Sequence, residues 1–458
     1  MGDVVLAVEG AECEDDNVCC PGGQAGCDFR CAPVLVGNGD PDGSSVEHRC
    51  ALLDYAWCTH RYVDRSQRRC SLTPTDTRAR LWVPSRAMTM SRARSQVLLA
   101  LAAALTACAP LRGRTRMVEG WVTARPAEVD MNGELLRAAV RRLDGERRHG
   151  IDSMLVVRRG RLVAERYWNG HDMASLHDLR SATKSVTSLL VGIALDRGLL
   201  GDVHDPALPY LTRAYPQQTT SPEITLEHLL TMRGGLACDD RDRGSPGHED
   251  RMYRSRDWTR FFLELPRLHA PGERAVYCTG GVVALGRIVA EASGTSIAEF
   301  SGEHLFGPLG ILAYAWQTFD GRRQVDTGGH LRLRPRAMAK IGQLVLQRGV
   351  WDQGDIVSGA WIDASTAVQT RFADDGRPYG YLWWRMQAVI DARPIDLIYA
   401  DGNGGQYIFI APALDLVVVF TGSNYNSPKA GRAFAILGEY ILPAAAPAPA
   451  APRGTGGP

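Results

Sequence analysis

Segments with the composition of strands lie at both ends of the main part of this chain, and helix-like segments lie between them. Near the start, the apolar runs 154–157 and 162–164 are separated by Arg158-Arg159-Gly160-Arg161, which predicts a hairpin. Near the end, three runs rich in β-branched and aromatic residues are 395–400, 407–411 and 414–421. Because strands must pair, we expect one antiparallel sheet built from both ends of a domain, with a large, mostly helical insertion.

Helices are predicted before, within and after this insertion. Leu136, Val140 and Leu143 mark one face of a helix, and residues 186–194 keep the 3.6-residue period up to Gly198. Further helices are expected after Thr225, from Pro335 to Gly349, and near residues 433–441. The fold class is therefore α+β, with terminal helices flanking the sheet.

The cysteines divide the chain. Eight of the eleven lie in the first seventy residues, a pattern typical of disulfides in an exported segment or of metal ligands in an intracellular one. Their spacing matches no zinc motif. Residues 1–89 are either an over-extended start, with Met88 or Met90 as the true beginning, or a fused module. We favour the first because these residues lack the apolar periodicity of a core.

Residues 90–108 have the pattern of an export signal. Arginines at 92 and 94 precede an apolar run over 97–105, and Leu105-Thr106-Ala107-Cys108 follows. The segment resembles a bacterial lipoprotein signal, which implies a lipidated Cys108 and a place in the cell envelope, in the periplasm or at the outer membrane. The alternative is a buried helix rich in alanine and leucine. Residues 109–127 would be a linker, and 444–458 a disordered Ala/Pro/Gly tail.

Charge and lysine usage narrow the function classes. A formal net charge of +1 gives no reason to expect nucleic acid as a partner, and a lipid anchor would be the means of membrane contact. The lysines are Lys184, Lys340 and Lys429, and none follows a glycine, which excludes a phosphate-binding P-loop. Arginine stays protonated at any working pH, so a lysine in such a chain marks a candidate base.

Ser181 and Lys184 form the first candidate catalytic pair. They lie in Arg180-Ser181-Ala182-Thr183-Lys184-Ser185, at the start of a predicted helix and one turn apart. Serine needs a base, and a lysine whose pKa burial has lowered can take its proton. The helix N-terminus favours a developing oxyanion. The spacing alone is not specific, so neighbouring motifs decide.

Two further motifs follow in the chain. Tyr277 lies in Val276-Tyr277-Cys278-Thr279-Gly280-Gly281, where it can shuttle a proton or simply pack the core. The second is Gly402-Asn403-Gly404-Gly405-Gln406, directly before a strand. Its glycines allow a close approach to substrate, and a main-chain N–H there can complete an oxyanion hole, although a plain hairpin turn fits as well.

In this order, the three motifs resemble those of the serine β-lactamase-like superfamily, which includes class C β-lactamases, penicillin-binding DD-peptidases, esterases and amide hydrolases. The likeness covers residues 128–443. It extends to four more blocks: 229–236, 271–273, 305–311 and 379–384. No Gly-x-Ser-x-Gly motif of an α/β-hydrolase occurs in the chain.

The resemblance implies a β-lactamase/transpeptidase-like fold and a serine hydrolase that needs no metal or cofactor. Ser181 would form an acyl-enzyme with a small-molecule ester or amide, Lys184 and Tyr277 would share the acid and base roles, and the N–H groups of Ser181 and Gln406 would hold the oxyanion. A β-lactamase-related esterase is the favoured activity. The alternatives are a β-lactamase or D-amino-acid peptidase, and a catalytically silent envelope-binding lipoprotein. The oligomeric state stays open.

The resemblance also identifies substrate contacts. The expected residues are Thr279, Asn403, Gly404, Gly405, Trp383 and Trp384. Thr279 stands where relatives have asparagine or serine, and Asn403 where lactamases have lysine and esterases often histidine. For the tryptophan pair, a place in the core is an equal alternative.

A pair of cysteines and a group of aspartates lie beside these motifs. In the resembling fold, Cys238 and Cys278 lie beside loops that flank the active site. If the chain is exported, they are expected to form a disulfide. Asp239, Asp240 and Asp242 superficially resemble a cation-binding loop, but no matching glutamate follows, so we expect a solvated acidic loop.

Overall fold

The computed structural model describes residues 120–446, except 147, 219–222, 320–323 and 353, together with short strands in the first 118 residues. It divides into one unit of residues 1–8 and 117–458 and another of residues 9–116. In the latter, β2 (Glu47–Leu52) and β3 (Ala56–Arg61) form an antiparallel hairpin. The signal segment with Cys108 lies outside the described residues, as does most of the Cys-rich segment.

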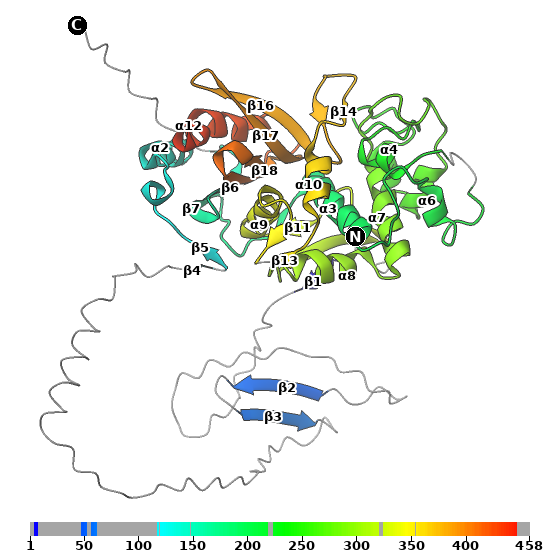
Figure 1. Ribbon diagram of the computed structural model, residues 1–458, viewed down its shortest axis with the longest axis horizontal. Helices are drawn as coiled ribbons and strands as arrows, with labels where there is room; N and C mark the ends of the chain where they lie inside the picture. The colour runs from blue at the N-terminus through cyan, green and yellow to red at the C-terminus, as the bar shows by residue number, and fades with distance from the viewer. Residues whose placement is uncertain are drawn as a thin grey trace, which may run out of the picture. The chain divides into compact units, whose positions relative to one another are not determined.

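An eight-stranded antiparallel sheet is the centre of the larger unit, in the order β14-β15-β16-β17-β18-β19-β6-β7 (Figure 1). The strands are β6 (Ile151–Arg158), β7 (Arg161–Tyr167), β14 (Thr370–Arg371), β15 (Pro378–Tyr379), β16 (Trp384–Ile390), β17 (Arg393–Gly402), β18 (Gln406–Ala411) and β19 (Leu416–Gly422). Along the chain, β6 is the first strand of this sheet and β19 the last, and the two pair with Val418 opposite Val156. The predicted sheet from both ends of the domain is thereby confirmed.

Helices cover both faces of this sheet. In β18, Ile408 points to α9 (Pro335–Leu346), where a Cβ on Gly342 would come within 2.8 Å of it. The alternate residues Tyr407 and Phe409 pack edge-to-face against Phe434 in α11 (Arg432–Ile436), with 5.0 Å between ring centroids in each pair. Because successive strand residues point to opposite faces, α9 and α11 lie on opposite sides, and β18 and β19 are buried throughout.

The terminal helices pack beside each other. They are α2 (Gly133–Asp144) and the run α11, η7 (Leu437–Ile441) and α12 (Leu442–Ala445). Ala444 and Ala445 are buried, and Trp121 is buried with its Nε1 donating to the carbonyl of Arg336. The folded unit therefore extends at both ends beyond the expected 128–443. Among the described residues, no helix is long and apolar enough to cross a membrane.

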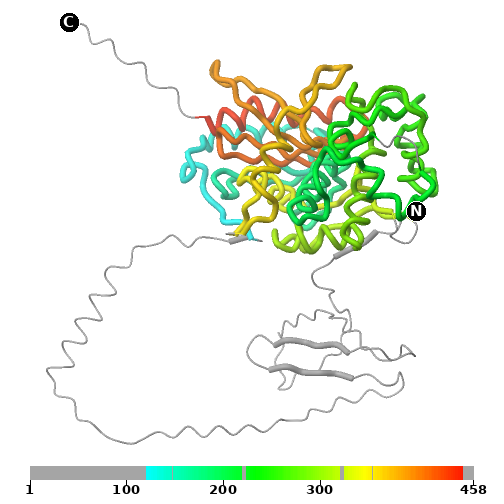
Figure 2. The backbone as a smooth tube through the Cα atoms, turned by 45° about the vertical axis from the view of Figure 1, so that its right-hand side comes forward, coloured from blue at the N-terminus to red at the C-terminus, as the bar shows by residue number. Residues whose placement is uncertain are grey.

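The insertion forms the second lobe, green in Figures 1 and 2. Its α-helices are α3 (Thr183–Asp196), α4 (Leu226–Leu230), α5 (Glu249–Met252), α6 (Trp258–Leu263), α7 (Thr279–Ser293) and α8 (Ile297–Ser301), with α10 (Gly359–Thr366) after α9. A small second sheet was not predicted. Its strands pair in the order β8 (His177–Asp178), β11 (Arg332–Leu333), β9 (Tyr314–Phe319) and β1 (Val4–Ala7). A further strand, β10 (Gln324–Val325), also pairs with β9. Three of the sheet's strands, β8, β10 and β11, have two residues each, which is too short for a periodicity to show in the sequence.

The remaining elements are short connections. Two hairpins are β4 (Met117–Val118) with β5 (Trp121–Val122), and β12 (Val350–Trp351) with β13 (Gly354–Asp355). The short helical turns are η1 (Pro126–Val129), η2 (Arg180–Ala182), η3 (Leu208–Leu211), η4 (Gly302–Phe306), η5 (Pro412–Leu414) and η6 (Pro428–Gly431).

Candidate active site

Ser181 lies in the 3₁₀ turn η2, directly before α3, rather than in the helix itself. The preceding residue, Arg180, has a φ of 49°, a left-handed conformation that costs a non-glycine residue energy. The carboxylate of Asp178 stabilises this turn by accepting the Arg180 N–H at 2.9 Å. The turn places Ser181 at the N-terminal end of α3, where the helix dipole favours negative charge.

Lys184 is buried in the first turn of α3, with 1% of its surface exposed. Its Nζ lies 3.4 Å from Ser181 Oγ, 3.1 Å from Thr279 Oγ1 and 2.5 Å from the carbonyl oxygen of Gly328. All three are hydrogen-bond acceptors for an ammonium group. The amine is therefore fixed beside the serine by contacts from three separate parts of the chain.

The electrostatic surroundings of Lys184 differ from the expectation. Burial alone lowers the pKa of Lys184, but the negative charges available at Tyr277, Glu249, Asp240 and Asp326 outweigh it, and the pKa lies above its ordinary value. The prediction of a lowered lysine pKa was wrong because it considered burial without these acids. At neutral pH, Lys184 is an ammonium group.

Tyr277 meets the same serine from the loop before α7. Its hydroxyl is hydrogen-bonded to Ser181, its ring lies 5.0 Å from Lys184 Nζ, and Trp384 stacks behind it at 6.1 Å and 15°. Burial raises the pKa of Tyr277 more than Lys184 and the Ser181 hydrogen bond lower it. Both candidate bases therefore hold their protons at neutral pH.

Thr279 was predicted to contact substrate, but its side chain is fully buried. It accepts a hydrogen bond from Lys184, and its Oγ1 donates to Glu249 Oε2 at 3.1 Å. Its backbone N–H donates to Asp240 Oδ2 at 2.6 Å, and the other Asp240 oxygen accepts from the N–H of Glu249 at 2.8 Å. Asp240 is thus a structural acceptor and not part of a solvated loop, whereas Asp242 is exposed as expected. The sequence carried no signal for this contact.

The third motif forms the hairpin between β17 and β18, beside η2. A Cβ on Gly402 would lie 2.0 Å from the carbonyl oxygen of Leu179, so a glycine is required for this close approach to the nucleophile turn. Gly404 and Gly405 have φ of 97° and 103°. The side chain of Gln406 bonds to both the carbonyl and the N–H of Gly422, which fixes its backbone at the start of β18.

Three of the predicted substrate contacts are engaged elsewhere. The Asn403 amide donates to Asn426 Oδ1 and accepts from the Asn426 N–H, both at 2.8 Å. Trp383 has no exposed surface and belongs to the core. Trp384 is 4% exposed and supports the Tyr277 ring from behind, so it does not form an open pocket wall.

Arg241 is a charged neighbour that the sequence analysis missed. Its guanidinium carbon lies 5.6 Å from the Tyr277 ring centroid and 4.8 Å from that of Phe372. It also pairs with the carboxylates of Asp374 and Asp375. The positive charge of Arg241 is therefore already shared between two carboxylates.

A disulfide joins Cys238 to Cys278, with 5.4 Å between their Cα atoms, and this is the pairing expected from the sequence. It connects the loop that carries Asp240 to the residue directly after Tyr277. The loop acids and the tyrosine are thereby held on one cross-linked segment.

The sequence model of the family described as beta-lactamase matches residues 136–439. The chain belongs to the beta-lactamase family. It is 26% identical over 289 residues to a 6-aminohexanoate-dimer hydrolase of Paenarthrobacter ureafaciens, covering 58% of this chain and 71% of that protein.

Solved structures show the same fold. A putative 6-aminohexanoate-dimer hydrolase from Bacillus anthracis has a TM-score of 0.56 at 20% identity, covering 67% of this chain and 81% of that one. A family VIII carboxylesterase has a TM-score of 0.53 at 16% identity, covering 68% of this chain and 96% of that one. The fold is therefore β-lactamase/transpeptidase-like, as predicted, and the chain is a hydrolase of this fold.

Proposed function

We propose that this protein cleaves a carboxylic ester or amide through an acyl-enzyme on Ser181, and that an ester is the preferred substrate. The observation that carries the proposal is the meeting of three groups at one point: Ser181 Oγ, Lys184 Nζ at 3.4 Å, and the hydroxyl of Tyr277 in a hydrogen bond to the serine. A binding protein has no need to bury a lysine against a serine, since burying a charged group costs free energy.

The starting protonation states of Lys184 and Tyr277 determine the order of the proton transfers. Lys184 and Tyr277 together lose one proton to solvent, and the resulting base accepts the Ser181 proton as Oγ attacks the carbonyl carbon. The same proton then passes to the leaving alcohol or amine. Water then attacks the acyl carbon, the same base takes one proton from the water, and this proton passes to Ser181 Oγ as the carboxylic acid leaves. The N–H groups of Ser181 and Gln406 are proposed to hold the oxyanion in both steps.

Charge on the substrate side favours neutral acyl groups. Asn403 is uncharged and hydrogen-bonded to Asn426, and the charge of Arg241 is shared with Asp374 and Asp375. An anionic substrate such as a β-lactam therefore gains little attraction here. The names of a carboxylesterase and a 6-aminohexanoate-dimer hydrolase among the similar proteins support the ester and amide classes. A β-lactamase or D-amino-acid peptidase is the alternative.

A fluorophosphonate probe tests the nucleophile. We expect the probe to label the wild-type protein on the peptide that contains Ser181, and not to label Ser181→Ala. A folded wild-type protein that does not label would favour the silent binding protein instead. A panel of acyl esters, amides and β-lactams then ranks the substrate classes.

We also propose that the protein is exported and anchored by a lipid on Cys108. The Cys238–Cys278 disulfide supports this, because disulfides persist in oxidising compartments. Expression from Met90 in a lipoprotein-processing host should give a membrane-bound chain that begins at a lipidated Cys108, as measured by intact mass. A chain that retains residues 90–107 without lipid would contradict this location.

A further inference from the structure

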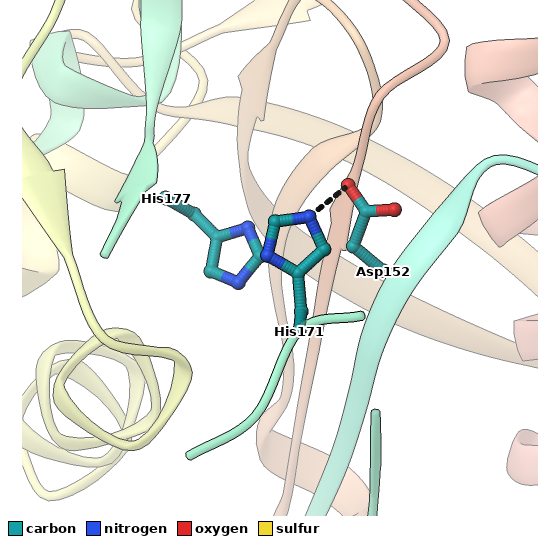
Figure 3. A group of neighbouring side chains, drawn as sticks. All are labelled: Asp152, His171 and His177. Carbon is teal, nitrogen blue, oxygen red and sulfur yellow. Dashed lines mark ion pairs between the residues drawn. The ribbon is translucent and has the colours of Figure 1, made fainter. Parts of the chain in front are cut away.

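Two histidines and an aspartate gather at a point that the proposed reaction does not use (Figure 3). Asp152 lies in β6, His177 in β8, and His171 in the loop between β7 and β8. One ring nitrogen from each histidine and one carboxylate oxygen of Asp152 lie within 4.8 Å of one another. These are three side chains of the types that bind transition metals.

The surroundings orient the Asp152 carboxylate. Its Oδ1 accepts hydrogen bonds from Asn169 Nδ2 at 2.8 Å and Ser423 Oγ at 3.1 Å. Its Oδ2 points to His171 Nε2 at 3.7 Å, too far for a hydrogen bond. Hydrogen bonds that fix one oxygen and leave the other directed at imidazoles are typical of the outer shell of a metal site.

A buried carboxylate needs a positive partner. The Asp152 side chain is 3% exposed, and within the described part of the chain no lysine or arginine forms an ion pair with it. Burying an uncompensated charge is costly, and a bound cation removes that cost. The site has the geometry to hold one beside this oxygen.

The two histidine rings are arranged so that both can bind the same ion. Their ring centroids are 4.6 Å apart with the planes at 43°, so the rings lie at an angle instead of stacking face to face. His177 is buried, with 6% of its surface exposed, so its ring is held inside the fold. The His171 side chain is 36% exposed, so the cluster is open to solvent on one side.

We propose that Asp152, His171 and His177 form a binding site for one Zn²⁺ ion, with water from the His171 side as the fourth ligand. Zinc takes histidine nitrogen and carboxylate oxygen in a tetrahedron with bonds of about 2.0 to 2.2 Å, which places neighbouring ligand atoms about 3.3 Å apart. The cluster must therefore contract from its 4.8 Å span, and binding requires the partly exposed side chain of His171 to move inward.

This proposal revises the expectation of no metal, which was drawn from the resemblance to the serine hydrolases. The fold brings Asp152 to His171 and His177 through the pairing of β7 with β6, in which Ser153 lies opposite Tyr167. The ion would tie the first strand of the main sheet to β8 of the small sheet. Its role is structural, and Ser181 chemistry does not pass through it.

Zinc binding to the chelator-treated full-length protein tests the site by calorimetry. His171→Gln should weaken one tight zinc-binding event at least about 100-fold. A change in the residues behind the metal ligands already costs about 10- to 100-fold in affinity, and the loss of a ligand should cost more. His204→Gln is the matched control, because its side chain is 71% exposed and lies at a separate ion pair with Glu227. It should bind as the wild type does.

The difference between the two variants decides the outcome, since cysteines in residues 1–89 can bind zinc independently. Zinc should also raise the melting temperature of wild type and His204→Gln more than that of His171→Gln. Equal zinc stoichiometry and affinity in both variants would overturn the proposal, as would the absence of binding in the wild type. Fluorophosphonate labelling of both variants shows that each is folded.

Discussion

The base side and the substrate side of the candidate site are built differently. On the base side, Lys184 and Thr279 are buried and hydrogen-bonded to each other, and Thr279 donates to Glu249 and Asp240. On the substrate side, Asn403 is partly exposed and bonded to its neighbour Asn426, and Arg241 shares its charge with nearby carboxylates. If the proposed function holds, the buried side supplies the proton transfers, and the open side, where this chain departs from the lactamases, selects the substrate.

The largest expected effect is on the base side. Ser181→Ala should lower kcat by at least about 10⁴-fold, as removal of a nucleophile does in other serine hydrolases. Lys184→Arg should be nearly as damaging, because a guanidinium cannot give up its proton at working pH. The measurement is steady-state hydrolysis of a p-nitrophenyl ester by folded variants.

Lys340→Arg is the matched control for this prediction. Lys340 is also a buried lysine, but its amine donates to the carbonyl oxygens of Leu309 and Gly310, away from Ser181. It should keep most of the activity. Substantial activity in Ser181→Ala or Lys184→Arg would remove the assignment of the base side.

The next effect concerns the substrate side. A hydrogen bond to a charged group contributes about 1.5 to 3 kcal/mol, so a site without the lactamase lysine should lose roughly tenfold to over a hundredfold in capture of anionic substrates. Short-chain p-nitrophenyl esters should therefore have a higher kcat/KM than a chromogenic cephalosporin. Asn403→Lys should narrow that gap.

Arg241 provides the counter-test. If the wild-type enzyme hydrolyses the cephalosporin faster than every ester, the neutral-substrate proposal is wrong and the protein acts as a β-lactamase. Arg241→Gln would then show whether this guanidinium supplies the missing charge, since its loss should lower cephalosporin turnover and leave the esters unchanged.

The same division explains what the sequence could predict. The Ser181–Lys184 spacing and the apolar, β-branched runs of the main sheet are local patterns, and local patterns are visible in a sequence. The contacts of Lys184 with Thr279 and Gly328 join positions far apart in the chain, and no local pattern indicates them. The direction of the Lys184 pKa depends on those distant acids, so burial alone gave the wrong sign.

A smaller effect is expected at Thr279. Its substitution distinguishes a residue that positions Lys184 from one that contacts substrate. Thr279→Val removes the hydroxyl that accepts from Lys184 and donates to Glu249, and should lower kcat about tenfold, since a hydrogen bond to a charged group contributes about 1.5 to 3 kcal/mol. KM should stay unchanged because the side chain is buried. Thr279→Ser keeps the hydroxyl and should recover kcat. A raised KM in Thr279→Val would return this residue to the substrate side.

The smallest effect is on pH dependence, and it tests the acids around Lys184 directly. The pKa of Lys184 is raised and that of Tyr277 is also raised, so the base appears when this pair loses a proton. Activity should therefore increase with pH from neutral into the alkaline range. The rate then follows the small deprotonated fraction, which grows as pH approaches the pKa of the pair.

Glu249→Gln removes one of the negative charges that raise the pKa of Lys184, while the amide still accepts the Thr279 hydroxyl. Asp240, Asp326 and Tyr277 remain, so the pKa of Lys184 should fall only in part. A lower pKa gives more deprotonated pair at a given pH, and the rising limb of the kcat/KM profile should move to lower pH. Asp250→Asn is the matched control, because this neighbouring carboxylate is 56% exposed and should leave the profile in place. A Glu249→Gln profile that coincides with wild type, or moves to higher pH, would mean that the buried acids do not set the proton affinity of Lys184.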